Sequence, residues 1–210
     1  MTEQGDLHNE RSLRAPTRIM VTTAVAFEAA LIVAALVLGW LLDEPPVSDF
    51  GFTLGGLAWG VAAVVPMLGL LWFSRQISWR PFRRLRIVLD RRLMPMFRGW
   101  SPWDLASLSL VAGVSEEMLF RGVVQDAATS RYGLPMGLMI GSLVFGMLHA
   151  VTRTYAVVGT LIGVYLGAIY VACGNLLVPI IAHGLYDFLA LLYLARLDAR
   201  RQARTQSAPQ

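Results

Sequence analysis

The sequence predicts an all-α integral membrane protein: a bundle of about six transmembrane helices with one amphipathic helix along the membrane surface. Hydrophobic residues make up 56% of the 210 residues and charged residues only 15%, which lies outside the range of ordinary soluble domains. The hydrophobic residues are gathered into runs of roughly 18 to 24 residues, the length that crosses about 30 Å of hydrocarbon. No repeat or break in composition divides the chain, so residues 1–210 are expected to form a single domain.

The first two runs are interpreted as retained transmembrane helices. The run 19–42 is too long for the hydrophobic region of a signal peptide, and it contains Glu28. The Asp-Glu-Pro-Pro sequence at 43–46 is a loop signal that separates this run from the next, at 52–73. The second run contains Pro66, which membrane helices tolerate better than soluble ones.

The segment 75–100 is too polar to cross a membrane, but its pattern is that of a helix lying on the membrane surface. Phe82, Leu85, Leu89 and Leu93 recur at helical spacing among arginines. A surface anchor is the simplest interpretation of this segment. A gate or a docking site for a substrate is the alternative.

Four further runs follow, at 103–125, 134–151, 155–173 and 176–195. The connections between them are short, so consecutive helices are expected to be antiparallel neighbours. Gly159, Gly163 and Gly167 are spaced by four residues in the fifth run. Such a stripe of small residues predicts that another helix backbone approaches closely, which is a packing feature and not a chemical one.

The arginines predict the orientation of the bundle. All 18 basic residues are arginine, and 16 of them fall on one side of the predicted spans. Because short cytoplasmic loops are enriched in basic residues, both termini and the segment 75–100 are expected to be cytoplasmic. In a soluble protein the net charge of +4 would suggest a nucleic-acid partner. Here the arginines are assigned to lipid headgroups and topology, and no nucleic acid is expected.

The third, fourth and sixth runs carry ionisable residues that a helix facing lipid would not carry. An ionised side chain at the bilayer centre costs at least ~2.5 to 3.5 kcal/mol on insertion scales, so such residues need compensating reasons. They occur in three groups with four-residue steps, which places each partner on the same helical face. The groups are Glu116 and Glu117 with Arg121, Phe145 with His149, and His183 with Asp187.

Helical geometry separates the two adjacent glutamates. Glu117 lies four residues before Arg121, about 40° away around the helix, whereas Glu116 points roughly 100° away from Glu117. The geometry therefore pairs Glu117 with Arg121 and leaves Glu116 without a local counter-ion. A buried carboxyl of this kind is suited to act as a general base.

His149 and His183 come from two other helices and are in a position to meet Glu116 in the interior of the bundle. A water molecule held between a carboxylate and an imidazole is a latent nucleophile, and the matching reaction is hydrolysis of an acyl bond, most naturally a peptide bond. No pair of Ser with His or Cys with His is evident. The single cysteine, Cys173, excludes an internal disulfide framework and a cysteine-based zinc cluster.

The three groups together resemble the family of CAAX proteases and bacteriocin-processing enzymes, the glutamate-type intramembrane endopeptidases that include the eukaryotic Ras-converting endoprotease and many bacterial membrane proteins. The family pattern on successive membrane helices appears here as EEMLFR at 116–121, FGMLH at 145–149 and HGLYD at 183–187. The resemblance covers about 100–194, and the first two spans carry no matching motif. It implies a peptide or protein substrate at a membrane, expected to be the bacterial plasma membrane.

The resemblance also implies a role for each motif residue. Glu116 and His149 would activate the water, and His183 with Asp187 would form the oxyanion site. Three residues would support them, namely Glu117, Arg121 and Phe145. Asp187 departs from the Asn of the eukaryotic enzymes, and an ionised aspartate cannot donate the hydrogen bond that an amide donates. Asp187 would therefore either be protonated or orient His183.

Three alternatives compete with a cofactor-free endopeptidase for CAAX-like processing, bacteriocin processing or immunity. Some members of the family act as membrane scaffolds or regulators, so the chain could bind a partner without cleaving it. Two His and one Glu are an adequate ligand set for zinc, although the spacing is not that of a His-Glu-x-x-His motif. A proton-coupled transporter is the remaining alternative. The sequence lacks the paired broken helices or inverted repeats typical of such transporters, which argues against it.

Overall fold

The computed structural model describes the backbone of residues 3–206 and the side chains of residues 17–205. Within residues 3–206 all regular secondary structure is helical, which confirms the predicted fold class. In chain order, with η marking a π- or 3-10 helix, the elements are α1 (Glu3–Leu42), α2 (Leu54–Gln76), α3 (Arg80–Val88), η1 (Leu89–Leu93), η2 (Met94–Phe97), α4 (Pro102–Leu119), η3 (Phe120–Gln125), α5 (Asp126–Tyr132), α6 (Leu134–Leu148), α7 (Arg153–Cys173) and α8 (Leu177–Gln206).

Four helices, α1, α2, α7 and α8, are long and apolar enough to cross a membrane. The apolar helix α6 has only 15 residues, which at 1.5 Å each span about 22 Å of the roughly 30 Å of hydrocarbon. Helix α4 contains Asp104, Glu116 and Glu117, which lower its hydropathy. With α4 and α6 included, the helices correspond to the six predicted spans, and the chain is an integral membrane protein.

Several boundaries differ from the predicted ones, and α1 already begins at Glu3, well before the predicted 19. The predicted span 103–125 is not one regular helix, because α4 ends at Leu119 and the π-helix η3 follows. Helix α6 ends at Leu148, and His149 caps it with φ −89° and ψ 9°, short of the predicted 151. Helix α8 continues to Gln206, well beyond the predicted 195, because its polar end extends past the apolar run.

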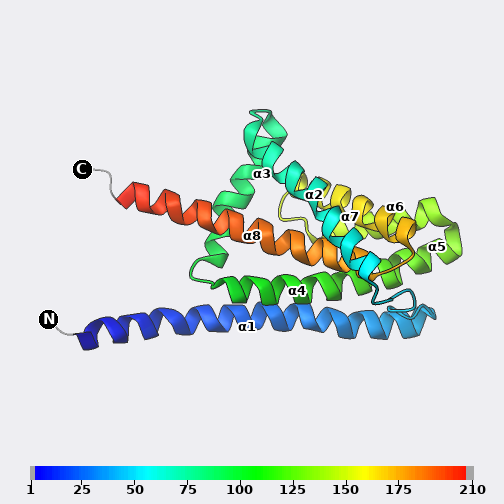
Figure 1. Ribbon diagram of the computed structural model, residues 1–210, viewed down its shortest axis with the longest axis horizontal. Coiled ribbons are helices and arrows are strands. Elements are labelled where there is room, and N and C mark those ends of the chain that lie inside the picture. The colour runs from blue at the N-terminus through cyan, green and yellow to red at the C-terminus, as the bar shows by residue number, and fades with distance from the viewer. Residues whose placement is uncertain (1–2, 207–210) are drawn as a thin grey trace.

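The helices are arranged around α4 and α8. Helix α1 lies along α4, α4 packs against α8, and α2 lies on the other side of α8 (Figure 1). Helices α6 and α7 pair with each other, as their short connection predicts. Helices α7 and α8 are also in contact, as expected for consecutive helices, although the principal partners of α8 are α2 and α4.

Several helix crossings are close at glycine, and two of them join α4 to α8 and α6 to α7. A Cβ atom on Gly113 of α4 would lie only 2.8 Å from the backbone nitrogen of Gly184 on α8. A Cβ atom on Gly163 of α7 would lie 3.0 Å from the Cα atom of Ser142 on α6. The predicted role of the α7 glycines in close packing is therefore confirmed for the contact with α6. The crossing of α4 and α8 brings the two helices that carry Glu117 and His183 into backbone contact.

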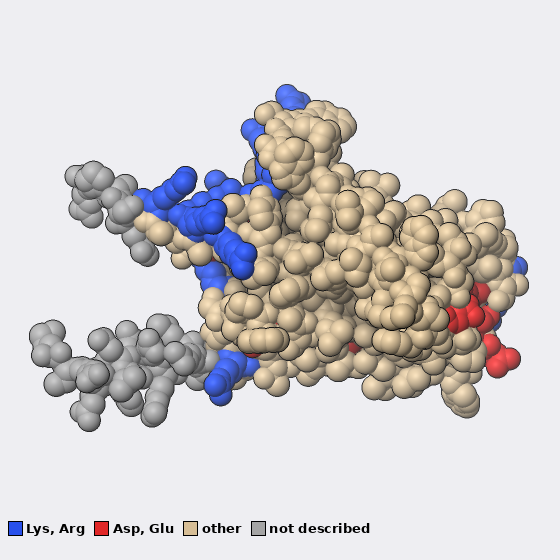
Figure 2. Space-filling model, viewed as in Figure 1, with Lys and Arg blue, Asp and Glu red and all other residues tan. Residues whose placement is uncertain are grey.

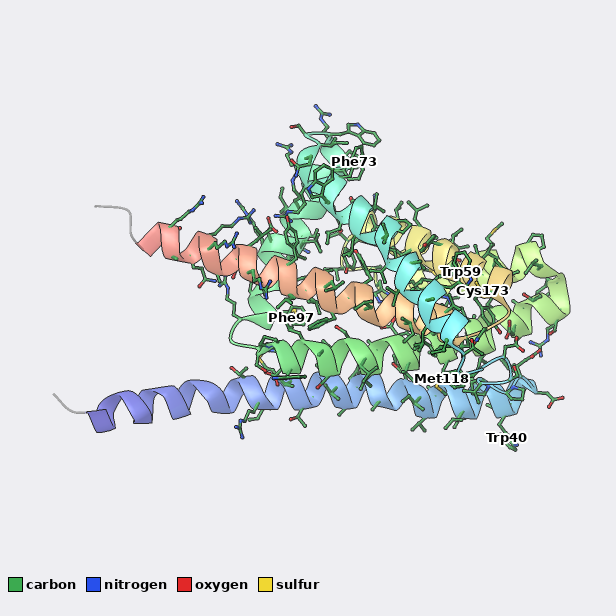
Figure 3. The ribbon with its side chains drawn as sticks, viewed as in Figure 1. Trp40, Trp59, Phe73, Phe97, Met118 and Cys173 are labelled. Atoms are coloured by element: carbon green, nitrogen blue, oxygen red, sulfur yellow. The ribbon has the colours of Figure 1, made fainter. Side chains whose placement is uncertain are left out.

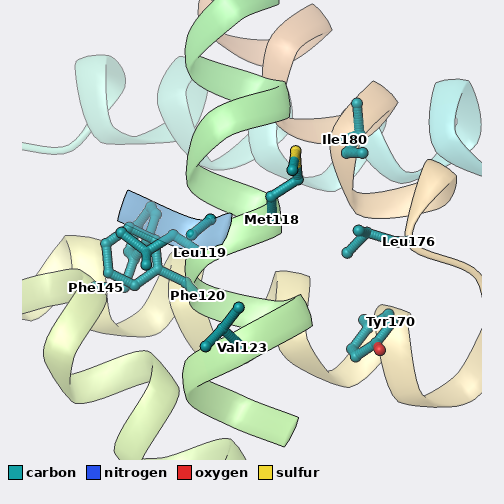
Figure 4. Close-up of a cluster of buried hydrophobic side chains, with 9 residues drawn as sticks. Met118, Leu119, Phe120, Val123, Phe145, Tyr170, Leu176 and Ile180 are labelled. Atoms are coloured by element: carbon teal, nitrogen blue, oxygen red, sulfur yellow. The ribbon is translucent and has the colours of Figure 1, made fainter. Parts of the chain in front are cut away.

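Apolar side chains fill the bundle on both sides of α4 and η3. Figure 4 shows Phe145 on one side of this helix and Tyr170, Leu176 and Ile180 on the other, all buried in one cluster. Large aromatic residues also face outward. Trp40 and Trp59 are 80% and 65% exposed, and Trp40 points away from the bundle in Figure 3, as expected for side chains in contact with lipid.

Charge separates the two ends of the bundle. Arginines gather at the end where α1 begins and α8 ends, and acidic residues gather on the visible face of the opposite end (Figure 2). The segment 75–100 lies at the arginine-rich end as α3, η1 and η2, in agreement with the predicted surface helix.

Ion pairs fasten this surface segment to α2 and α8. Asp90 of η1 accepts hydrogen bonds from Arg75 at 3.1 Å and from Arg201 at 2.6 Å, and Arg98 donates to Asp198 at 2.8 Å. Burial of the Asp90 carboxyl opposes its ionisation, but the bonds from both arginines outweigh burial and hold the pKa of Asp90 below its usual value. The segment is therefore held by charged pairs that persist at neutral pH.

The crossing of α4 and α8 generates a stability prediction. Gly113→Ala should lower the free energy of unfolding by about 1–3 kcal/mol, because the added methyl group meets backbone atoms that no rotamer change can move. Thermal and denaturant unfolding of the purified protein in detergent measures this loss. Gly69→Ala on α2 is the matched control, since a Cβ atom there meets nothing within 4 Å. Equal stability of the two variants would contradict the close crossing.

Candidate active site

Glu116 and Glu117 lie in the last turn of α4, directly before the π-helix η3 that contains Arg121. Glu117 and Arg121 are 0% and 1% exposed, so both charges are removed from solvent and lipid. The predicted pair is present, with Arg121 Nη1 donating to Glu117 Oε1 at 3.0 Å. A π-helical turn at this point is notable because such turns are frequent at functional sites.

Arg121 has further partners that fix its position. Its Nη2 atom donates to the carbonyl oxygen of Gly163 on α7 at 3.2 Å, and its guanidinium lies 4.7 Å from the centre of the Phe145 ring. These contacts connect η3 with α6 and α7. A buried guanidinium requires such compensation, since an unpaired charge in the interior costs several kcal/mol.

His183 is held by Glu117. The Nδ1 atom of His183 lies 2.7 Å from Glu117 Oε1, and an ionised carboxylate only accepts, so Nδ1 carries the proton of this bond. The Nε2 atom lies 3.5 Å from Asp187 Oδ2. Of the two roles considered for Asp187, one was to orient His183. Glu117 makes the shorter contact with the imidazole, so the orientation of His183 depends mainly on Glu117.

Glu116 faces His149 across a longer gap. His149 Nδ1 lies 2.8 Å from the carbonyl oxygen of Phe145, which only accepts, so Nδ1 is the donor. In the neutral ring Nε2 then has a free lone pair, and it lies 3.4 Å from Glu116 Oε2. Glu116 is 6% exposed, and its Oε2 atom has no hydrogen-bond partner within the described residues. A lone pair and a carboxylate oxygen that face each other are suited to share the two protons of one water molecule.

Phe145 positions both imidazoles. Its ring stacks on His149 with centres 4.3 Å apart and meets the edge of His183 at 5.7 Å. The four-residue step from Phe145 to His149 predicts that the two share a face, and this stacking confirms it. The aromatic ring also covers the guanidinium of Arg121, so one side chain contacts both imidazoles and the buried cation.

The site opens into a chamber of about 540 Å³. Glu116, Phe145, His149, His183 and Asp187 line one part of it, while Glu117 and Arg121 lie behind this wall. Mostly apolar side chains line the rest, and they include Phe82, Leu85, Leu89, Leu93 and Phe97 of the surface segment. Figure 3 shows Phe97 at the arginine-rich end, between α8 and α4. The surface segment therefore forms part of the chamber wall.

The structure also places side chains at the chamber that sequence reasoning did not assign to the site. Tyr155 of α7 and Tyr186 of α8 line it, and no periodic pattern singles them out, because their orientation depends on how the helices pack. Glu28 of α1 lines it as well. The sequence did contain a signal for Glu28, because an isolated carboxyl group inside a predicted membrane span is unusual unless it has a function.

The described side chains contain no group of three or more His, Cys, Asp or Glu residues arranged to hold a metal ion. Glu116, His149 and His183, the ligand set considered for zinc, all line the chamber. The chemistry of water activation by a carboxylate requires only the pair of Glu116 and His149.

Residues 98–189, a little under half of the chain, match the family model of the Rce1-like type II CAAX prenyl endopeptidases. The match runs from just before α4 into α8 and contains all three sequence motifs. This segment is thus similar to the CAAX protease family. Neither the curated proteins nor the solved structures give a match. The likeness to a family of endopeptidases supports peptidase activity in general.

The different surroundings of the two glutamates lead to a prediction. Glu117→Gln should destabilise the protein by about 3 kcal/mol, because it leaves Arg121 buried without its carboxylate partner. Glu116→Gln should change stability by less than about 1 kcal/mol, since Glu116 Oε2 makes no hydrogen bond that the amide would lose. Thermal unfolding of both variants in the same detergent distinguishes them. Equal losses would show that the ion pair does not stabilise the bundle.

Proposed function

We propose that the chain is an endopeptidase that hydrolyses a peptide bond of a membrane-associated peptide with a water molecule activated by Glu116 and His149. The observation that carries this proposal is the unpaired Glu116 Oε2 atom facing His149 Nε2 at 3.4 Å in the chamber wall. Similarity to the CAAX protease family favours CAAX-like processing, or bacteriocin processing and immunity, as the physiological setting.

In the proposed first step, the water donates hydrogen bonds to the Glu116 carboxylate and to His149 Nε2. Glu116 accepts one proton as the water oxygen attacks the peptide carbonyl carbon, which gives a tetrahedral oxyanion and a protonated Glu116. The carbon–nitrogen bond then breaks, and Glu116 returns the proton to the leaving amine. The products are a carboxylic acid and an amine, and the carboxylate is regenerated.

His183 and Asp187 are proposed to stabilise the oxyanion. With Nδ1–H committed to Glu117, the donor that His183 can offer to the chamber is Nε2–H, which requires a doubly protonated ring. The carboxylate of Glu117 at 2.7 Å stabilises such a ring. A preorganised donor of this kind typically contributes a factor of about 10² to 10³ in turnover.

The proposal predicts a loss of cleavage in Glu116→Gln. The variant should lower turnover at least about 100-fold, because an amide cannot accept the proton from water. Comparing peptides from membranes that contain the wild-type chain, Glu116→Gln or the control Glu44→Gln measures the loss. A product missing only in Glu116→Gln identifies both activity and substrate, while identical peptide sets would favour a scaffold or regulator.

The same cleavage should survive exhaustive chelation, because the proposed mechanism uses no cofactor. Activity that is abolished by a chelator and restored by zinc would reassign Glu116, His149 and His183 from water activation to metal binding.

Orientation is a separate prediction. The arginine-rich end that holds α3 and the end of α8 should face the cytoplasm, because basic residues are retained on that side. Alkaline phosphatase fused after residue 210 should be inactive, and the same enzyme inserted in the loop between α1 and α2 should be active. The reverse pattern would place the surface segment 75–100, which forms part of the chamber wall, on the other side of the membrane.

Asp187 allows the oxyanion assignment to be tested. Its carboxyl lies 3.5 Å from His183 Nε2 and is proposed to act as a protonated donor. Asp187→Asn should keep activity and hold it to higher pH, because an amide donates at every pH. A pH–rate profile of the variant measures this. Loss of activity at all pH values, in a variant that unfolds like the wild type, would reject the donor role.

A further inference from the structure

The chamber has an unusual balance of charge. Its described lining contains three carboxyl groups, from Glu28, Glu116 and Asp187, and two imidazoles, from His149 and His183. No arginine is among these lining residues, although the chain has 18 basic residues, all of them arginine. Three carboxyl groups therefore face two imidazoles in the described lining. The chamber offers no guanidinium or ammonium group to an anionic ligand.

Glu28 is the carboxyl group of this set that the proposed chemistry does not use. It comes from α1, outside the segment that matches the family model. Its only hydrogen bond within the described residues is a long one, in which Ser115 Oγ donates to Glu28 Oε2 at 3.4 Å. Ser115 Oγ also lies 3.3 Å from the carbonyl oxygen of Ala112, so the single hydroxyl proton is divided between two acceptors. The carboxyl of Glu28 is thus left largely unsatisfied beside the chamber.

A second observation points to a ligand at this wall. Glu116 is 6% exposed and lines the same chamber, and its Oε2 atom lacks a hydrogen-bond partner among the described residues. Glu28 and Asp187 line the same chamber as Glu116. Burial of several carboxyl groups in an apolar chamber is unfavourable unless a cation compensates them. Within the described protein, His149 and His183 are the cationic candidates that face them.

From this arrangement we infer that Glu28 is a specificity-determining residue, and that it binds a basic side chain, Lys or Arg, of the peptide in the chamber. The apolar lining that surrounds it would contact the apolar residues that flank this basic residue. A peptide with an acidic side chain at the same place would lie against the carboxyl group of Glu28 and is disfavoured. The inference rests on the proposed peptidase function for its choice of ligand.

The inference is tested with three fluorescent N-acyl peptide amides that are identical except for one central residue, which is Lys, Gln or Glu, between leucines. The full-length chain is placed in nanodiscs of neutral phosphatidylcholine, so that anionic lipid does not attract the Lys peptide. Fluorescence anisotropy measures binding in a Glu116→Gln background, where turnover does not consume the peptides. Hydrolysis of the same peptides is measured with Glu116 intact.

In the Glu116→Gln background, the Lys peptide should bind at least about tenfold more tightly than the Glu peptide, with the Gln peptide between them. Adding Glu28→Gln should reduce this ratio to about threefold or less, and Glu28→Asp should restore most of it. Glu44→Gln is the matched control, because Glu44 does not line the chamber and bonds with Ser130 instead. With Glu116 intact, Glu28→Gln should raise KM for the Lys peptide, whereas Glu44→Gln should leave kcat/KM for the Lys and Gln peptides unchanged.

The outcomes separate this inference from the proposed function. Equal binding of the three peptides, or a ratio that Glu28→Gln leaves unchanged, overturns the inference. Cleavage of the peptides without a preference for Lys overturns it too, while supporting the peptidase function. A preference for Lys that depends on Glu28, in a chain that cleaves none of the peptides, supports the subsite for a basic residue and counts against the peptidase function. If Glu28→Gln unfolds, binding of the three peptides is compared between the Glu28→Asp protein and the protein with Glu28 intact. This comparison still decides whether the chamber prefers a basic residue.

Discussion

The buried charge of Arg121 is the constraint on which the rest of the site depends. A guanidinium in the interior of a membrane bundle is stable only if partners surround it, because the cost of leaving it unpaired exceeds the stability of most single contacts. Glu117, the Gly163 carbonyl and the face of Phe145 supply those partners from three helices. Since Glu117 also holds His183, the same ion pair fixes α4, α6, α7 and α8 relative to one another. The position of the histidine is thus a consequence of how the arginine is compensated.

Two adjacent glutamates differ in their surroundings because of helical geometry. The carboxylate that points toward Arg121 and His183 is neutralised and rigid, whereas its neighbour points about 100° away and meets only His149 across the chamber wall. The close crossing at Gly113 and Gly184 makes this division feasible, since a bulkier residue would move α8, and with it His183, away from α4. Gly113, one turn before the glutamates, therefore contributes to the site by allowing α8 to pack closely against α4.

Sequence periodicity was sufficient to predict those parts of the structure that depend on one helix at a time. Apolar runs predicted the spans, and four-residue steps predicted the Glu117–Arg121 pair and the stacking of Phe145 on His149. What could not be predicted depends on several helices at once. The π-helix η3 changes the phase of the helix after Leu119, and the contact between Glu117 and His183 requires the crossing of α4 and α8. Tyr155 and Glu28 belong to the site only because α7 and α1 pack beside it.

The chamber joins parts of the chain that are under different constraints. The segment 98–189 supplies the motif residues shared with the CAAX protease family, while α1, α2 and the surface segment supply other parts of the wall. Changes in the first group disturb a coupled network of buried charges, so few substitutions are tolerated there. Changes in the second group alter the shape and charge of the chamber without moving Glu117, Arg121 or His183. The carboxyl of Glu28 is of this second kind: it lines the chamber from α1, and its substitution would change the charge of the wall without altering the Glu117–Arg121 pair.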